Sequence, residues 1–221
     1  MSPKWTKHPF GVSVSNSKSS KMNQKTFEST LRKMRSNVSH WHDMATDDTV
    51  NDGIAWYDDA KGFALMLSNE FDVSPIRAGG VISALSPRNK WERNKIDAWN
   101  VFQAVRDDVS PDRLKVSTFN SNKIKAFNIA RGKRKISESS RKTHRFAMNV
   151  GAFDMNAVTI DSWMLFAFQT KSKSRKNLDT KVTPKQYDIM ERKFQRISRD
   201  MGYAPAHLQA VVWLVIRELW G

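Results

Sequence analysis

Apolar side chains recur every three or four residues through most of this chain, and no stretch alternates strictly as a half-buried strand does. Breaks such as Ser86-Pro87 and Gly202 separate the periodic stretches, and we take the acidic residues 47–52 as a further interruption. The pattern therefore predicts an all-α fold. We expect helices over residues 25–44, 56–70, 75–85, 91–106, 122–131, 141–150, 161–169, 183–201 and from 205 onward.

The composition indicates a folded core and an anionic partner. Hydrophobic residues make up 39% of the 221 residues, with eight Trp and twelve Phe, which suffices for a sizeable core. The net charge of +15 favours nucleic acid or an anionic membrane surface as partner. No apolar run approaches the ~20 residues of a membrane-spanning helix. The composition therefore favours nucleic acid over a membrane as partner. Separately, we expect a monomer.

The chain contains no cysteine, which excludes several kinds of covalent bond and metal site. These include disulfide bonds, a thiol nucleophile, cysteine-ligated zinc and a cysteine-held iron–sulfur cluster. His40 and His42 lie two residues apart, so they do not share a helix face, and no third ligand accompanies them. We therefore predict neither a metal ion nor a cofactor. The first ten residues lack the apolar core of a secretory signal, so we expect a cytoplasmic protein.

Two polar stretches set the predicted domain boundaries. Residues 1–25 are rich in Ser, Lys and Asn with little periodicity. We interpret them as a flexible basic arm that is either solvated or follows DNA phosphates. Residues 26–221 are one helical domain in this interpretation. Within it, residues 171–182 form a basic loop or an insertion.

Two segments in the second half carry a specific pattern: residues 141–149 (RKTHRFAMN) and residues 158–163 (VTIDSW). Together they resemble the active-site segment of the helix-hairpin-helix DNA glycosylases, the superfamily that includes endonuclease III. In that family a hairpin leads into a helix that opens with a Lys-Thr pair, and an apolar-apolar-Asp segment follows. The resemblance implies a two-lobed helical fold with the active-site cleft between the lobes. It also implies Asp161 as the catalytic carboxylate and Lys142 as the lysine of the bifunctional members.

Further segments resemble the same family, and one departs from it. Residues 81–87 are similar to the end of the helix before the base-wedging loop, and residues 205–213 to the C-terminal helix of phage-borne relatives. The family hairpin carries two glycines that let backbone amides approach a phosphate, whereas this chain has ISESS at 136–140. We therefore expect a degenerate hairpin. Nearby basic residues would supply phosphate contacts instead: Lys123, Lys125, Lys133, Arg134, Lys135, Arg141 and Arg145.

Asp161 suits the chemistry that the resemblance implies. Cleavage of an N-glycosidic bond builds positive charge on the sugar, and a fixed carboxylate stabilises that charge or activates the attacking water. The apolar neighbours Val158, Ile160, Trp163 and Leu165 would shield the carboxylate and strengthen its field. The alternative is a helix N-cap, because Asp161 directly precedes an apolar helix.

Lys142 has two candidate roles. It lies between Arg141 and Arg145, and burial among these cations would favour the neutral amine that a Schiff-base nucleophile requires. The alternative is a phosphate-binding lysine on a basic helix face. A monofunctional glycosylase needs only the aspartate.

A base must leave the duplex stack before it can react, which requires wedge and pocket residues. We select Arg88, Asn89 and Trp91 because they occupy the loop in which the family inserts its wedge, and Trp163 because it closely follows Asp161. For Trp91, a core position at a helix start is the alternative. The other tryptophans on helical stripes are assigned to the core: Trp56, Trp99, Trp213 and Trp220.

Three functions stay open. We expect first a DNA glycosylase that acts on a flipped base of double-stranded DNA, in the bacterial host cytoplasm if a phage encodes the chain. The second is a transferase on the same scaffold, since some phage relatives resemble enzymes that attach amino-acid or polyamine groups to thymine derivatives. The third is a non-catalytic DNA-binding protein, which the missing hairpin glycines and the strong basicity favour.

Overall fold

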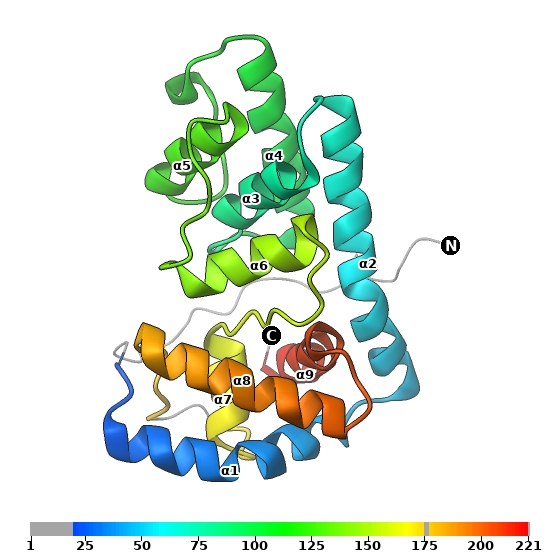
Figure 1. Ribbon diagram of the computed structural model, residues 1–221, viewed down its shortest axis with the longest axis vertical. Coiled ribbons are helices and arrows are strands. Elements are labelled where there is room, and N and C mark those ends of the chain that lie inside the picture. The colour runs from blue at the N-terminus through cyan, green and yellow to red at the C-terminus, as the bar shows by residue number, and fades with distance from the viewer. Residues whose placement is uncertain (1–19, 175–176, 221) are drawn as a thin grey trace.

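The computed structural model describes residues 20–174 and 177–220 as helices joined by loops (Figure 1). Within these residues there is no β-strand, only an isolated bridge between Lys21 and Lys181, so the all-α prediction is confirmed. A short 3-10 turn at Pro111–Arg113 lies between the fourth and the fifth helix. The helices are α1 (Gln24–His42), α2 (Asp47–Glu70), α3 (Pro75–Leu85), α4 (Trp91–Arg106), α5 (Asn120–Ala130), α6 (Arg141–Gly151), α7 (Ser162–Gln169), α8 (Pro184–Asp200) and α9 (Pro205–Trp220).

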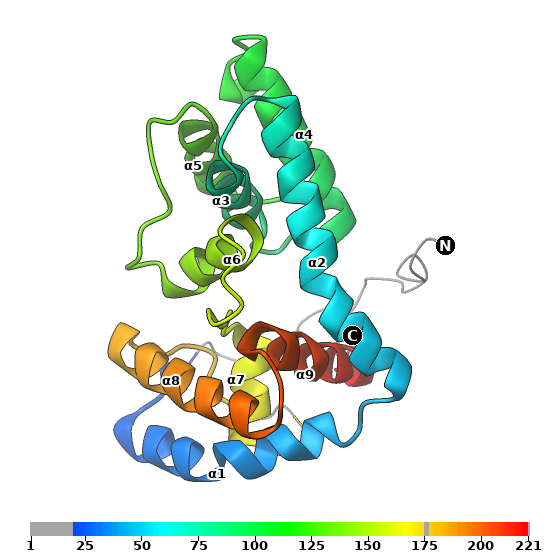
Figure 2. The ribbon, with the colours of Figure 1, turned by 45° about the vertical axis from the view of Figure 1, so that its right-hand side comes forward.

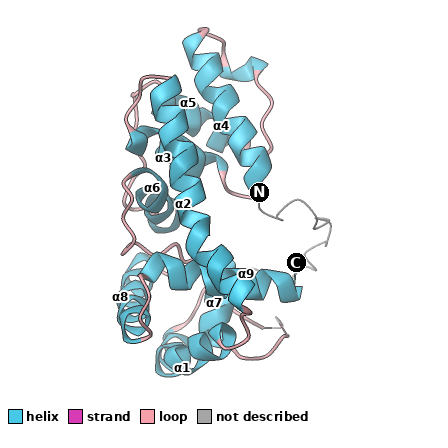
Figure 3. Cartoon of the chain, turned by 90° about the vertical axis from the view of Figure 1, so that its right-hand side faces the viewer, coloured by secondary structure: helices cyan, strands magenta, loops and turns pink. Residues whose placement is uncertain are grey.

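Two hydrophobic clusters divide the helices into two groups. The first group is α2 to α6, and the second is α1, α7 and α8. The chain begins in the second group, crosses to the first through the long α2 and returns after α6 (Figures 1 and 2). Helix α9 joins the groups, since Ala206 and Ala210 belong to the first cluster and Leu208 and Val212 to the second. Figure 3 shows α9 between the two groups, where it packs against α2.

Helix α2 begins about two and a half turns earlier than the sequence pattern predicts. The acidic residues 47–52 are its first turns, not an interruption. The Thr46 hydroxyl accepts the backbone N–H of Thr49, and Asp47 and Asp48 interact favourably with the positive end of the helix dipole. The extra turns let α2 reach from the second group into the first.

Glycines allow α3 and α6 to cross closely. A Cβ atom at Gly79 would lie 2.7 Å from the Cα of Gly151, and a Cβ atom at Gly151 would lie 2.6 Å from the carbonyl oxygen of Pro75. Neither position therefore has room for a side chain. This crossing lies at the C-terminal end of α6, whose first turn carries Lys142.

The two predicted polar stretches lie against one another where the structure describes them. Met22 is buried, its N–H donates to the carbonyl of Lys181, and the Ser20 hydroxyl donates to Asp179. Residues 20–25 of the predicted arm are therefore folded, with α1 starting at Gln24. Residues 1–19 of that arm and residues 175–176 of the predicted basic loop lie outside the described residues.

Candidate active site

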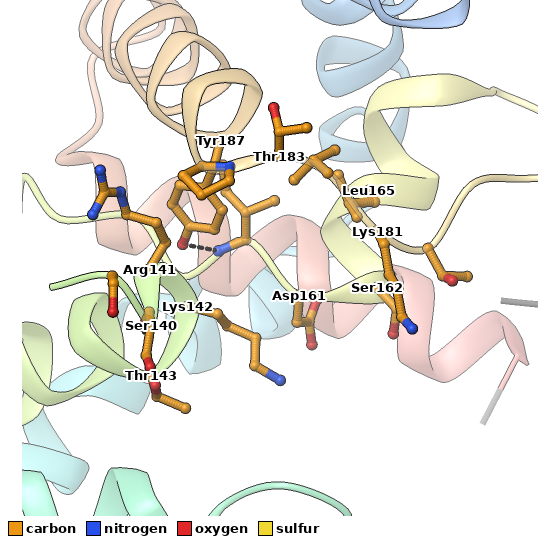
Figure 4. A pocket seen from close by; sticks show the side chains of 15 residues that line it. Ser140, Arg141, Lys142, Thr143, Asp161, Ser162, Leu165, Lys181, Thr183 and Tyr187 are labelled. Atoms are coloured by element: carbon orange, nitrogen blue, oxygen red, sulfur yellow. Dashed lines mark hydrogen bonds between the residues drawn. The ribbon is translucent and has the colours of Figure 1, made fainter. Parts of the chain in front are cut away.

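A pocket of about 490 Å³ opens where the two groups of helices meet (Figure 4). The N-terminal ends of three helices line it: α6 from the first group, and α7 and α8 from the second. Its volume falls within the roughly 300–1,000 Å³ of typical small-ligand sites. Helix N-termini and lysine side chains make the pocket electropositive around one carboxylate. The polar residues that line it include Ser140, Lys142, Thr143, Asp161, Ser162 and Lys181.

Asp161 immediately precedes α7, and two hydrogen bonds hold its carboxylate. Oδ1 accepts the backbone N–H of Met164 at 2.9 Å, and Oδ2 accepts the indole N–H of Trp213 at 3.1 Å. Asp161 is therefore the N-cap of α7, as the alternative interpretation of the sequence predicts. The capping role leaves the residue in the wall of the pocket.

Burial of the carboxyl group raises the pKa of Asp161 above the ordinary value of an aspartate, because the charged form loses solvation. The N–H of Met164, the charge of Lys142 and the indole N–H of Trp213 act in the opposite direction, but burial is the largest effect. A poorly solvated carboxylate with a fixed orientation exerts a strong field on a cation that forms beside it.

Lys142 lies in the first turn of α6, and its side chain extends across the pocket toward Asp161 (Figure 4). The residue is exposed. The burial that a Schiff-base nucleophile would need is therefore not present. The arrangement brings an ammonium group and a carboxylate, nineteen residues apart in the sequence, to the same pocket.

The arginines on either side of Lys142 form ion pairs with α8. Arg141 binds Asp188 through two nitrogens, at 2.7 and 2.9 Å, and Arg145 Nε lies 2.8 Å from Glu191. The bond between Arg141 and Asp188 lowers the pKa of Asp188 and raises that of Arg141, and the bond to Glu191 raises the pKa of Arg145. The sequence selects both arginines for DNA phosphates, whereas the structure uses them to connect the two groups of helices.

The loop before α6 presents most of the remaining predicted phosphate contacts. Lys133, Arg134 and Lys135 are exposed there. No residue of 136–140 has a positive φ, so the loop does not reproduce the backbone conformation that the missing glycines would allow. Earlier in the chain, Lys123 donates to the carbonyl of Leu114, and Lys125 is partly exposed on α5.

The predicted wedge residues divide between the surface and the core. Arg88 is exposed with φ of 59°, and its guanidinium lies 5.1 Å from the ring centre of Phe119. Asn89 donates to the buried carboxylate of Asp97, which also accepts the backbone N–H of Ser117. That carboxylate therefore fixes the Arg88 loop to the segment before Phe119.

For two aromatic residues, Trp91 and Phe119, the structure shows a position that the selection of wedge residues did not include. Trp91 packs against Trp56 and Phe63, which is the core alternative. Phe119 was not selected from the sequence, yet half of it is exposed beside Arg88. An exposed aromatic residue in a loop is visible only once the packing is known, because the sequence pattern assigns large apolar residues to the core.

Trp163 and Trp213 also differ from the expectation. Trp163 is partly buried and packs edge-on against Phe166, in the second cluster. Trp213, which the helical stripe assigns to the core, donates to Asp161 and lies under the guanidinium of Arg217 at 4.4 Å. The signal in the sequence was weak: only the indole N–H distinguishes Trp213 from its apolar neighbours on α9.

Neither metal ligands nor a membrane helix emerge from the described residues. Among them, His, Asp and Glu side chains nowhere gather in threes as metal ligands would. His42 lies 3.0 Å from the Tyr203 hydroxyl instead. None of the described helices combines the length and the apolar character that crossing a bilayer requires.

Fold and site together define an all-helical protein with a carboxylate–lysine pocket between two groups of helices. The chain belongs to a family of unknown function (DUF7178), which matches residues 20–219. No curated protein and no solved structure matches the chain. The resemblance to the helix-hairpin-helix glycosylases therefore stays a prediction from the sequence.

Proposed function

We propose that this protein is a DNA glycosylase that cleaves the N-glycosidic bond of a base flipped out of duplex DNA. One observation carries the proposal: Asp161, poorly solvated and held by two N–H donors, shares a pocket with Lys142 at the junction of two groups of helices. The sequence motifs that suggest the glycosylase family single out these same two residues.

In the proposed reaction the bond between C1′ and the base nitrogen breaks, and its electron pair leaves with the base. Positive charge then develops on C1′ and the ring oxygen of the sugar. The Asp161 carboxylate stabilises this charge and accepts a proton from the water that bonds to C1′. The hydrogen bonds from Met164 and Trp213 keep the carboxylate oriented throughout.

Lys142 serves as a cation in this proposal. The side chain is exposed and lacks the burial that a Schiff-base nucleophile would use, so we propose hydrolysis without strand cleavage. The ammonium group would hold a phosphate next to the extruded nucleotide. Lys133, Arg134 and Lys135 would contact the DNA backbone farther from the reacting sugar, and Arg88 with Phe119 would fill the space that the base leaves.

Mass spectrometry of nucleosides tests the proposal. The protein is incubated with duplex DNA that carries altered bases and with phage DNA that contains natural modifications. Free base and abasic sites support the glycosylase. An added mass on an intact nucleoside indicates the transferase instead. Salt-sensitive DNA binding with no product from any substrate indicates a non-catalytic binding protein.

A further inference from the structure

We propose that Tyr187 and Glu191 of α8 are positioning residues that hold Asp161 in its reactive place, an inference that rests on the proposed glycosylase function. Neither residue was selected from the sequence. Both act through the non-helical segment 157–160, which directly precedes Asp161.

The backbone of segment 157–160 is largely buried, but it makes no hydrogen bonds to other backbone groups of the described residues. Ala157, Val158 and Ile160 are each at most 4% exposed, and no backbone–backbone hydrogen bond among the described residues involves 157–160. Buried N–H and C=O groups are nearly always paired, because an unpaired one costs about 1–3 kcal/mol. Side chains must therefore provide the hydrogen-bond donors and acceptors that a neighbouring strand would provide in a sheet.

Tyr187 supplies one donor and one acceptor. Its hydroxyl donates to the carbonyl of Val158 at 2.8 Å and accepts the N–H of Ile160 at 3.0 Å. Tyr187 is 4% exposed, and burial strongly raises the pKa of its hydroxyl, so the group stays protonated. The phenol thus bridges the backbone of Val158 and Ile160, just before Asp161.

Glu191 lies one turn further along α8 and holds the same segment. Its Oε1 accepts the N–H of Val158 at 3.1 Å, and Arg145 of α6 binds both carboxylate oxygens through Nε. Asn149, also on α6, donates to the carbonyl of Ala157 at 2.8 Å. Both groups of helices therefore fix the segment that carries Asp161.

These contacts matter for catalysis because Ile160 is the residue before Asp161. Loss of the anchor on its N–H would free the backbone from which the carboxylate reaches Met164 and Trp213. A displacement of about 1 Å in a reacting group can lower a rate on the order of 100-fold. Water would then also reach the carboxylate.

The test compares Tyr187→Phe with Tyr203→Phe. Each variant removes one hydroxyl from a residue that packs in the second cluster, but Tyr203 lies in the turn between α8 and α9 and bonds His42 of α1, not segment 157–160. Three quantities are measured: the Tm, the pKa of Asp161 by NMR titration, and kcat for base release per folded molecule. We expect a lower Tm in both variants. Only Tyr187→Phe should lower the pKa of Asp161 toward the ordinary value and reduce kcat about 10- to 100-fold, with little change in KM.

Equal Asp161 titration curves in the two variants, or equal kcat per folded molecule, would overturn the inference. The NMR titration needs no substrate, so it decides the positioning role even if the wild-type protein releases no base and the proposed function fails. If the Tyr187→Phe variant does not fold, the Glu191→Gln variant replaces it in the test. It keeps the size of the side chain but removes the charge that binds Arg145 and leaves one oxygen to accept from both Arg145 and Val158, so it should shift the Asp161 titration in the same direction. An unshifted curve would count against the inference.

Discussion

At the scale of single residues, Asp161 combines two roles. As an N-cap it satisfies a free N–H of α7, and as a pocket residue it presents a partly desolvated charge. The indole of Trp213 completes its hydrogen bonding from α9. Burial raises its pKa while Lys142 opposes the rise, so the protonation of this one side chain sets the conditions for the proposed reaction.

The raised pKa of Asp161 predicts the pH dependence of base release. The ionised carboxylate is the active form, so the rate should fall with falling pH as Asp161 takes up a proton. Because burial raises the pKa, this loss should begin at a higher pH than for an ordinary aspartate. Single-turnover rates across a pH series check this, with substrate binding measured at each pH. An acid limb at or below the ordinary aspartate range would contradict the expectation.

At the scale of elements, the sequence periodicity predicts the helices but not the support of the segment between α6 and α7. Capping residues mark starts such as Thr183-Pro184 at α8. The predicted start of α2 at residue 56 was wrong. The acidic residues 47–52 resemble a break between helices, although acidic residues favour the first turn of a helix. The partners of segment 157–160 lie up to 33 residues away, so no local pattern could identify them.

The crossing of α3 and α6 predicts a stability difference between two glycine substitutions. Gly79→Ala should destabilise the protein by roughly 1–3 kcal/mol, because the new methyl group would meet the backbone of Gly151. Gly62→Ala is the matched control on α2, where nothing lies within 4 Å. It should stabilise by up to about 1 kcal/mol. Urea denaturation measures both, and equal effects would show that the helices do not cross as described.

At the scale of the whole molecule, α9 and two ion pairs connect the groups of helices around the pocket. The sequence predicts an all-α fold, and its motifs place Lys142 and Asp161 in one site. It assigns Arg141 and Arg145 to DNA because both lie in a basic run. Their acidic partners on α8 are 47 and 46 residues away, respectively, so the pairing depends on tertiary structure and could not be predicted.

The distribution of charge predicts how DNA binding depends on salt. Replacing Lys133, Arg134 and Lys135 together by Gln should reduce the slope of log K against log[salt] by up to about 2.7, at roughly 0.9 per phosphate contact. The control replaces Arg35, Lys61 and Arg106 by Gln. It removes the same charge, but from residues that pair with Asp200, Asp58 and Glu70. Equal slopes for the two triple variants would show that the exposed loop does not contact DNA.

The release of base by wild-type and Asp161→Asn protein from the same duplex, under single-turnover conditions at pH 7, tests the central claim most directly. Asparagine keeps an oxygen for the N-cap, but its NH2 group cannot accept the indole N–H of Trp213. We therefore expect a lower Tm and compare rates per folded molecule, whereas the DNA affinity should not fall. The account predicts that the rate of base release falls about 10²- to 10⁴-fold. Equal rates from the two folded proteins would contradict it.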